Sequence, residues 1–159
     1  MNQTETCCFT GHRNLLPSEI ETIQTKMRQQ VETTIHDGYR HFLCGMANGA
    51  DLLFAQVVAE LKQQYPIALE AAIPYPARLQ SNNPVFRQLL PACDIIKVHS
   101  PVYHAGCYQK RNRYMVDVSS RIITVYNGSE KGGTFSTLQY ARQCSLQVII
   151  IPTKASPNL

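Results

Sequence analysis

The sequence lacks the features that mark several large classes of protein. None of its 159 residues is tryptophan and only 16 % are charged, against roughly 25 % in an average globular chain, which argues against a disordered protein. No apolar run approaches the roughly 20 residues that a membrane-spanning helix needs, and the polar first residues do not resemble a signal peptide. We therefore expect a cytoplasmic protein that does not interact with a membrane.

Metal and disulfide signatures are also missing. The six cysteines form no C-x-x-C pair, and none lies at zinc-finger spacing from a histidine. We interpret most of them as small, reduced core residues. The sequence thus predicts no metal site, and a chain of this length needs neither a metal nor a disulfide to fold.

Short apolar strands alternate with helical patterns along the chain. Strands are expected at 6–10, 41–44, 68–73, 95–98, 121–126 and 148–151. Helices are expected from a capping box at Ser18 and Glu21 to Asp37-Gly38, at 52–64, after Asn83-Pro84, around 110–113 and at 134–144. This order predicts one α/β domain over 1–159: a Rossmann-like, doubly wound, mostly parallel sheet with helices on both faces, a core at about 6–152 and a flexible tail at 153–159.

Two glycine-rich turns, 45–51 and 128–134, follow strands and open helices. Such turns allow close backbone approach, and a helix N-terminus offers free N–H groups, so both are candidate phosphate cradles; tight turn geometry alone is the alternative reading. The second turn has Gly128 and Gly133-Thr134 at Walker A spacing but lacks the lysine, and no G-x-G-x-x-G follows the first strand. The missing motifs therefore argue against an ordinary P-loop NTPase and against a nicotinamide dehydrogenase.

Basic residues gather at two places, and the net charge of +4 suits an anionic partner. Arg13 follows the first strand, and Lys110, Arg111 and Arg113 precede the fifth. On a helix Lys110 and Arg113 share a face, whereas Arg111 points elsewhere.

Three motifs together carry a family resemblance. They are, in order, Thr10-Gly11-His12-Arg13, Gly45-Met46-Ala47-Asn48-Gly49-Ala50-Asp51 and Gln109-Lys110-Arg111-Asn112. Through these three motifs, in the same order, the chain resembles the YpsA-like branch of the SLOG superfamily over about 6–152. Arg111-Asn112-Arg113, a strand and Gly133-Thr134 also resemble the pattern of the DNA-processing DprA proteins. The resemblance implies a Rossmann-like fold that binds nucleotides, nucleotide-derived ligands or nucleic acid, and self-association, for which we expect a homodimer.

The superfamily also includes the Lonely Guy phosphoribohydrolases, and the match to these enzymes is incomplete. They cleave an N-glycosidic bond with an arginine before the fifth strand and a glutamate after the glycine loop. Arg111 matches the arginine, but residues 135–139 contain no carboxylate, and Glu130 lies before the glycines. Hydrolysis normally requires a carboxylate, so the sequence favours binding over catalysis.

We therefore predict a binding or sensing module for a phosphate-bearing, nucleotide-type small molecule such as ADP-ribose, an NAD derivative or a nucleoside monophosphate, with no required cofactor. The predicted ligand-binding residues come from four separate stretches: Gly11, His12, Arg13, Gly45, Gly49, Asp51, Arg111, Gly132, Gly133 and Thr134. One alternative is an N-glycosidase that uses Arg111 with Glu130 or Asp51. Another is weak binding of single-stranded nucleic acid through 110–113. The main hypothesis requires the four stretches to converge into one electropositive crevice.

Overall fold

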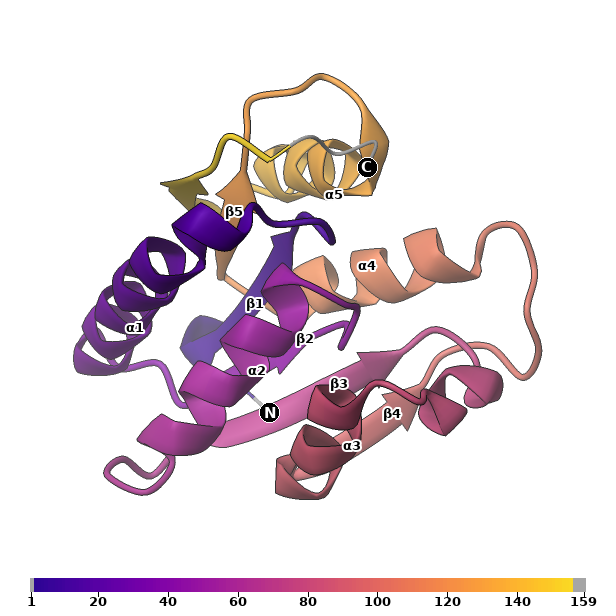
Figure 1. Cartoon of the computed structure of the whole chain (residues 1–159), viewed down its shortest axis with the longest axis horizontal. Coiled ribbons are helices and arrows are strands. Elements are labelled where there is room, and N and C mark those ends of the chain that lie inside the picture. The colour runs from indigo at the N-terminus through magenta and orange to yellow at the C-terminus, as the bar shows by residue number, and fades with distance from the viewer. Residues whose placement is uncertain (1, 156–159) are drawn as a thin grey trace.

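Six strands form one sheet in the computed structural model, which describes residues 2–155 (Figure 1). They are β1 (Thr6–Gly11), β2 (His41–Cys44), β3 (Ala68–Ile73), β4 (Ile95–Val98), β5 (Arg121–Tyr126) and β6 (Gln147–Pro152). Every pair of neighbouring strands is parallel, in the order β4-β3-β2-β1-β5-β6. The predicted α/β, Rossmann-like sheet is confirmed, and it is entirely rather than mostly parallel.

Five α-helices cover the two faces of this sheet. They are α1 (Ile20–His36), α2 (Ala50–Leu61), α3 (Pro84–Leu89), α4 (Cys107–Asp117) and α5 (Gly132–Gln143). Figure 1 shows α2 passing in front of the sheet beside α1, while α4 and α5 pack against each other. Helices α1 to α3 share one hydrophobic core with the sheet, and α4 and α5 share a second.

The alternation of strand side chains explains the two cores. In β1, Cys7 and Phe9 belong to the core under α1 and α2, whereas Cys8 belongs to the core under α4 and α5, because successive side chains of a strand point to opposite faces. Phe9 stacks on Phe54 of α2 at 4.5 Å between ring centroids. The buried side chains of the strands thus hold helices to both faces, as doubly wound sheets require.

The strand order places a topological switch point between β1 and β5. From β1 the chain builds outward through β2, β3 and β4, and then returns to add β5 and β6 on the other side of β1. In sheets of this kind a crevice opens at the carboxyl ends of the strands beside the switch point. The loops after β1 and β5 and the first turns of α2 and α5 are therefore the parts of the chain positioned to form a site.

Three local predictions differ from the structure. Ser18 lies in a short 3₁₀ turn at Pro17–Glu19 and does not cap α1, because the turn leads directly into the helix. Helices α2 and α5 each begin two residues earlier than predicted, at Ala50 and Gly132. Both of these starts lie inside the glycine-rich turns 45–51 and 128–134, which the sequence predicts as loops.

The start of the predicted flexible tail is also held by the fold. Residues 156–159 lie outside the described part of the chain, but Thr153 and Ala155 are buried. The Thr153 hydroxyl donates a 2.6 Å hydrogen bond to the Glu19 carboxylate, and the Ala155 carbonyl accepts one from the Asn127 side chain, also at 2.6 Å. These bonds correct the expectation of a free tail from residue 153. Over residues 2–155, no helix combines the length and the apolar character that crossing a bilayer would take.

Candidate functional site

A crevice of about 270 Å³ opens beside the carboxyl end of β1. Eight of the ten predicted ligand-binding residues line it: Gly11, His12, Arg13, Asp51, Arg111, Gly132, Gly133 and Thr134. They come from the last residue of β1, the loop after it, and the helices α2, α4 and α5. The structure therefore brings all four predicted stretches to one place.

The other two predicted residues, Gly45 and Gly49, shape the crevice from behind. A Cβ atom on Gly45 would lie 2.4 Å from Nη1 of Arg111, and a Cβ on Gly49 would lie 2.0 Å from the carbonyl oxygen of Arg13. Gly49 also has a φ of +84°, which a side chain disfavours. Both glycines are thus explained by the close approach of other protein groups rather than by a ligand.

Arg111 is buried, with only 4 % of its surface exposed. Its Nη1 donates to the carbonyl oxygens of Gly45 and Ala72, each at 2.9 Å, and its Nε donates to Oδ1 of Asn112 at 2.8 Å. The guanidinium therefore ties α4 to the loop after β2 and to β3, while one side of it faces the crevice. The prediction that Arg111 diverges from its neighbours is confirmed, because Lys110 and Arg113 are exposed.

Asp51 is the one carboxylate among the described residues that line the crevice. It lies in the first turn of α2, and its Oδ2 accepts a 3.0 Å hydrogen bond from the N–H of Ala47, so it braces the turn rather than capping the helix. Burial raises the pKa of Asp51 to about 6, although the positive charge of Arg111 lowers it. A carboxyl group with such a pKa changes its charge near neutral pH.

His12 links the two loops at the switch point. Its ring is buried, and Nε2 accepts a 3.1 Å hydrogen bond from the N–H of Asn127, after β5. Because burial lowers the pKa of His12, the ring is neutral at physiological pH, with its proton on Nδ1. His12 therefore contributes a neutral, fixed wall to the crevice rather than a positive charge.

The first turn of α5 supplies the exposed backbone of the crevice. Gly132 has a φ of +92°, and a Cβ on Gly133 would meet nothing within 4 Å. The helix has no side-chain cap at Lys131, so its first N–H groups and the positive end of its dipole remain open. Gly133 is thus the lining glycine at which a ligand could approach the backbone closely.

Of the two remaining charged candidates, Arg13 lines the crevice and Glu130 does not. Among the described residues, Arg13 is the solvent-exposed cation that lines the crevice, and its Cζ lies 5.4 Å from the ring centroid of Tyr108. Glu130 is exposed and does not line the crevice. Of the two carboxylates considered for catalysis, only Asp51 therefore lies at the site.

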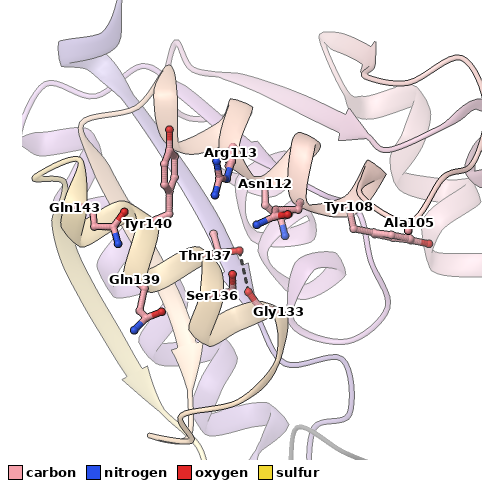
Figure 2. Close-up of a pocket in the computed structure, with 11 residues that line it drawn as sticks. Ala105, Tyr108, Asn112, Arg113, Gly133, Ser136, Thr137, Gln139, Tyr140 and Gln143 are labelled. Atoms are coloured by element: carbon pink, nitrogen blue, oxygen red, sulfur yellow. Dashed lines mark hydrogen bonds between the residues drawn. The ribbon is translucent and has the colours of Figure 1, made fainter.

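Sequence reasoning missed a second hollow. A groove of about 340 Å³ runs between α4 and α5 and meets the crevice at Asn112 and Gly133, which line both (Figure 2). Asn112 belongs to the motif Gln109-Lys110-Arg111-Asn112, but the groove depends on how α4 and α5 pack, for which the sequence carries no direct signal.

Two curated proteins are similar to this chain in sequence. A curated UPF0398 protein of Bacillus pumilus is 23 % identical over 71 % of this chain and 64 % of its own length, and a UPF0398 protein of Halalkalibacterium halodurans is 26 % identical over 78 % and 69 %. The chain thus spans about two thirds of the length of these relatives.

Two solved structures share the fold. DNA processing protein A from Helicobacter pylori, described for its single-stranded DNA binding mode, aligns with a TM-score of 0.66 at 18 % identity, over 98 % of this chain and 68 % of its own. The structural genomics target TM1055 aligns with a TM-score of 0.61 at 14 % identity, over 91 % and 72 %. The model of the YspA SLOG family matches residues 6–150, nearly the whole chain, and the chain therefore belongs to that family.

Proposed function

We propose that this chain binds a phosphate-bearing, nucleotide-derived small molecule, such as ADP-ribose, an NAD derivative or a nucleoside monophosphate, in the crevice beside β1. The observation that carries the proposal is the convergence of four separate stretches of sequence on one crevice. Membership of the SLOG family supports the ligand class.

The chemistry of the crevice suits an anion. The first turns of α2 and α5 both contribute lining residues, Asp51 from one and Gly132 to Thr134 from the other. Free N–H groups and aligned peptide dipoles at such helix ends bind phosphate. Arg13 and Arg111 add positive charge. A volume of about 270 Å³ lies just below the range of roughly 300–1,000 Å³ for small-molecule pockets, enough for a phosphate and an attached sugar.

Calorimetric titration with ADP-ribose, pyrophosphate and AMP tests the proposal. Gly133→Asp should abolish binding, because it places a carboxylate against the anion at a position where a side chain meets no other group. Gln29→Glu is the matched control: it makes the same charge change on exposed α1, across the sheet, and should leave affinity unchanged. Heat in none of the wild-type titrations, or equal loss in both variants, would contradict the proposal.

A second candidate function rests on Asp51. General acid–base catalysis is most effective when the pKa of the group lies near the working pH, and the raised pKa of Asp51, about 6, meets this condition beside a cationic site. In an N-glycosidase, water would add to the anomeric carbon and give its proton to Asp51. The bond from that carbon to the base nitrogen would break, and the departing base would take a proton from solvent.

Chromatography of AMP or NAD incubated with the purified protein tests this second function. Release of free base that is lost in Asp51→Asn and kept in Glu130→Gln would support it, since Glu130 does not line the crevice. Intact substrate at high protein concentration would refute catalysis and leave the binding proposal standing.

Single-stranded nucleic acid is a less favoured ligand. The DprA neighbour is described as a single-stranded DNA binder, but the basic cluster of this chain offers only Lys110 and Arg113 to solvent, because Arg111 is buried. Two exposed cations neutralise few phosphates, so we propose that any affinity for a strand is weak.

A further inference from the structure

The crevice continues into the groove between α4 and α5. Asn112 on α4 and Gly133 on α5 line both hollows, and Figure 2 shows them on two neighbouring helices. Together the hollows form one depression, and the crevice alone, at about 270 Å³, lies just below the usual range of small-molecule pockets. A ligand anchored in the crevice would therefore extend along the groove.

The groove is polar but carries little charge. Among the described residues that line it there is no carboxylate, and Arg113 is the single cation. Four side-chain amides face it, those of Gln109, Asn112, Gln139 and Gln143. An amide presents a donor beside an acceptor, the pattern that matches the edge of a nucleobase.

These amides are available for a ligand. In the described part of the chain no hydrogen bond engages the side chains of Gln109, Gln139 or Gln143, and Asn112 uses only its oxygen, which accepts from Nε of Arg111. The three glutamines are exposed to solvent, so a ligand in the groove would replace water at their amides.

Flat groups at the groove provide stacking surfaces. Cζ of Arg113 lies 4.9 Å from the ring centroid of Tyr140. Tyr108 lies within 5.4 Å and 5.7 Å of the guanidinium carbons of Arg13 and Arg111, at the junction of groove and crevice. Aromatic rings and guanidinium planes both stack on bases.

We infer that the α4–α5 groove is the subsite for the nucleobase of a nucleotide whose phosphate lies in the crevice. This inference rests on the proposed function and specifies its ligand. A polyphosphate tail or a nucleic-acid strand would need a row of cations to follow its backbone, and the groove offers one. An uncharged, hydrogen-bonding ring fits the amides and flat groups.

Calorimetry with AMP and ribose 5-phosphate isolates the base, because ribose 5-phosphate carries a hydroxyl group where AMP carries adenine. The wild type should bind AMP at least tenfold more tightly, roughly the gain expected from one stacked base. Ser136 is exposed in the middle of α5 and lines the groove but not the crevice. Ser136→Tyr should fill the groove, remove the preference for AMP and leave ribose 5-phosphate binding unchanged. Thr33→Tyr, on the exposed side of α1, is the control and should bind both ligands like the wild type.

The outcomes separate this inference from the function beneath it. Equal affinity of the wild type for AMP and ribose 5-phosphate would overturn the groove and leave phosphate binding intact. Equal weakening of both ligands by Ser136→Tyr would also overturn it, since the groove would then not be a separate subsite. An oligonucleotide that displaces AMP and loses affinity in Ser136→Tyr would assign the groove to a strand. Failure of both ligands and of ADP-ribose to bind the wild type would remove the proposed function as well.

Discussion

Replacing Arg111 with methionine should destabilise the protein strongly. Methionine keeps much of the apolar stem but removes the guanidinium that donates to the carbonyl oxygens of Gly45 and Ala72 at 2.9 Å each. Hydrogen bonds from a charged donor contribute about 1.5–3 kcal/mol each. The loss of these two should therefore cost about 3–6 kcal/mol.

Urea unfolding followed by circular dichroism measures this loss as a lower midpoint at unchanged slope. Arg113→Met is the matched control, two residues along α4 and exposed. Its guanidinium packs on Tyr140, a contact of about 0.5–1 kcal/mol. Arg111→Lys should lie between the two, since it keeps the charge and fewer of the donors.

A loss below about 1 kcal/mol in Arg111→Met, similar to that in Arg113→Met, would refute this reasoning. The buried guanidinium would then not be a structural tie, although it satisfies two backbone carbonyls. The result also governs functional assays. If the loss is large, reduced ligand binding in an Arg111 variant reports on folding as well as on contact, whereas Gly133→Asp and Ser136→Tyr do not share that ambiguity.

Three further predictions follow from single features. Burial raises the pKa of Asp51 from its ordinary 3.8 to about 6 in the folded protein, so its contribution to stability is greatest below pH 4 and is lost as pH rises through 6, by up to about 3 kcal/mol. The difference in urea midpoint between the wild type and Asp51→Asn, measured from pH 4 to 7, should follow this trend, and a difference that stays constant with pH would contradict it. Gly49→Ala should lower the free energy of unfolding by at least about 2 kcal/mol, measured by thermal unfolding, because of the positive φ and the clash with Arg13. Gly38→Ala, at a φ of +102° with open space around it, should lower it by about half as much, and equal losses would refute the clash. Single-stranded DNA binding measured by fluorescence anisotropy should vary with salt with a logarithmic slope near −1.4, about −0.7 for each phosphate met by Lys110 and Arg113, and a slope steeper than about −3 would show a larger basic surface.

Much of the fold could be predicted because its signals are local. The strands at 41–44, 68–73, 95–98 and 121–126 were predicted with the bounds that the structure has, since each is a short, mostly apolar run between turn residues. The predicted start of α5 was wrong because Gly132 and Gly133 are poor helix formers and local sequence favours a loop there, whereas the helix begins at Gly132. The predicted capping box was wrong because Ser18 lies within the 3₁₀ turn Pro17–Glu19, which leads directly into α1.

For the site, the sequence predicted the location but not the role of each residue. Its location followed from the rule that loops at the carboxyl ends of parallel strands meet at the switch point, which needs no knowledge of side-chain packing. The roles of individual residues could not be derived from that rule. Arg111 is separated by 66 and 39 residues from its two carbonyl partners, and nothing near it in sequence indicates them. The homodimer and the cytoplasmic location stay predictions.

Arg111 and Arg13 have different roles, and this difference limits the negative charge of a ligand that the crevice can neutralise. Arg111 is fixed by Gly45 and Ala72, and its charge is offset by Asp51 whenever that carboxyl is ionised. Arg13 and the open N–H groups of α5 then remain as the free positive elements. Such a site suits one phosphate or a pyrophosphate diester better than a triphosphate, whose additional charges would find no partner in a groove with a single cation. The electrostatics and the shape of the depression therefore favour the same class of ligand: a nucleotide of low charge with its base in the α4–α5 groove.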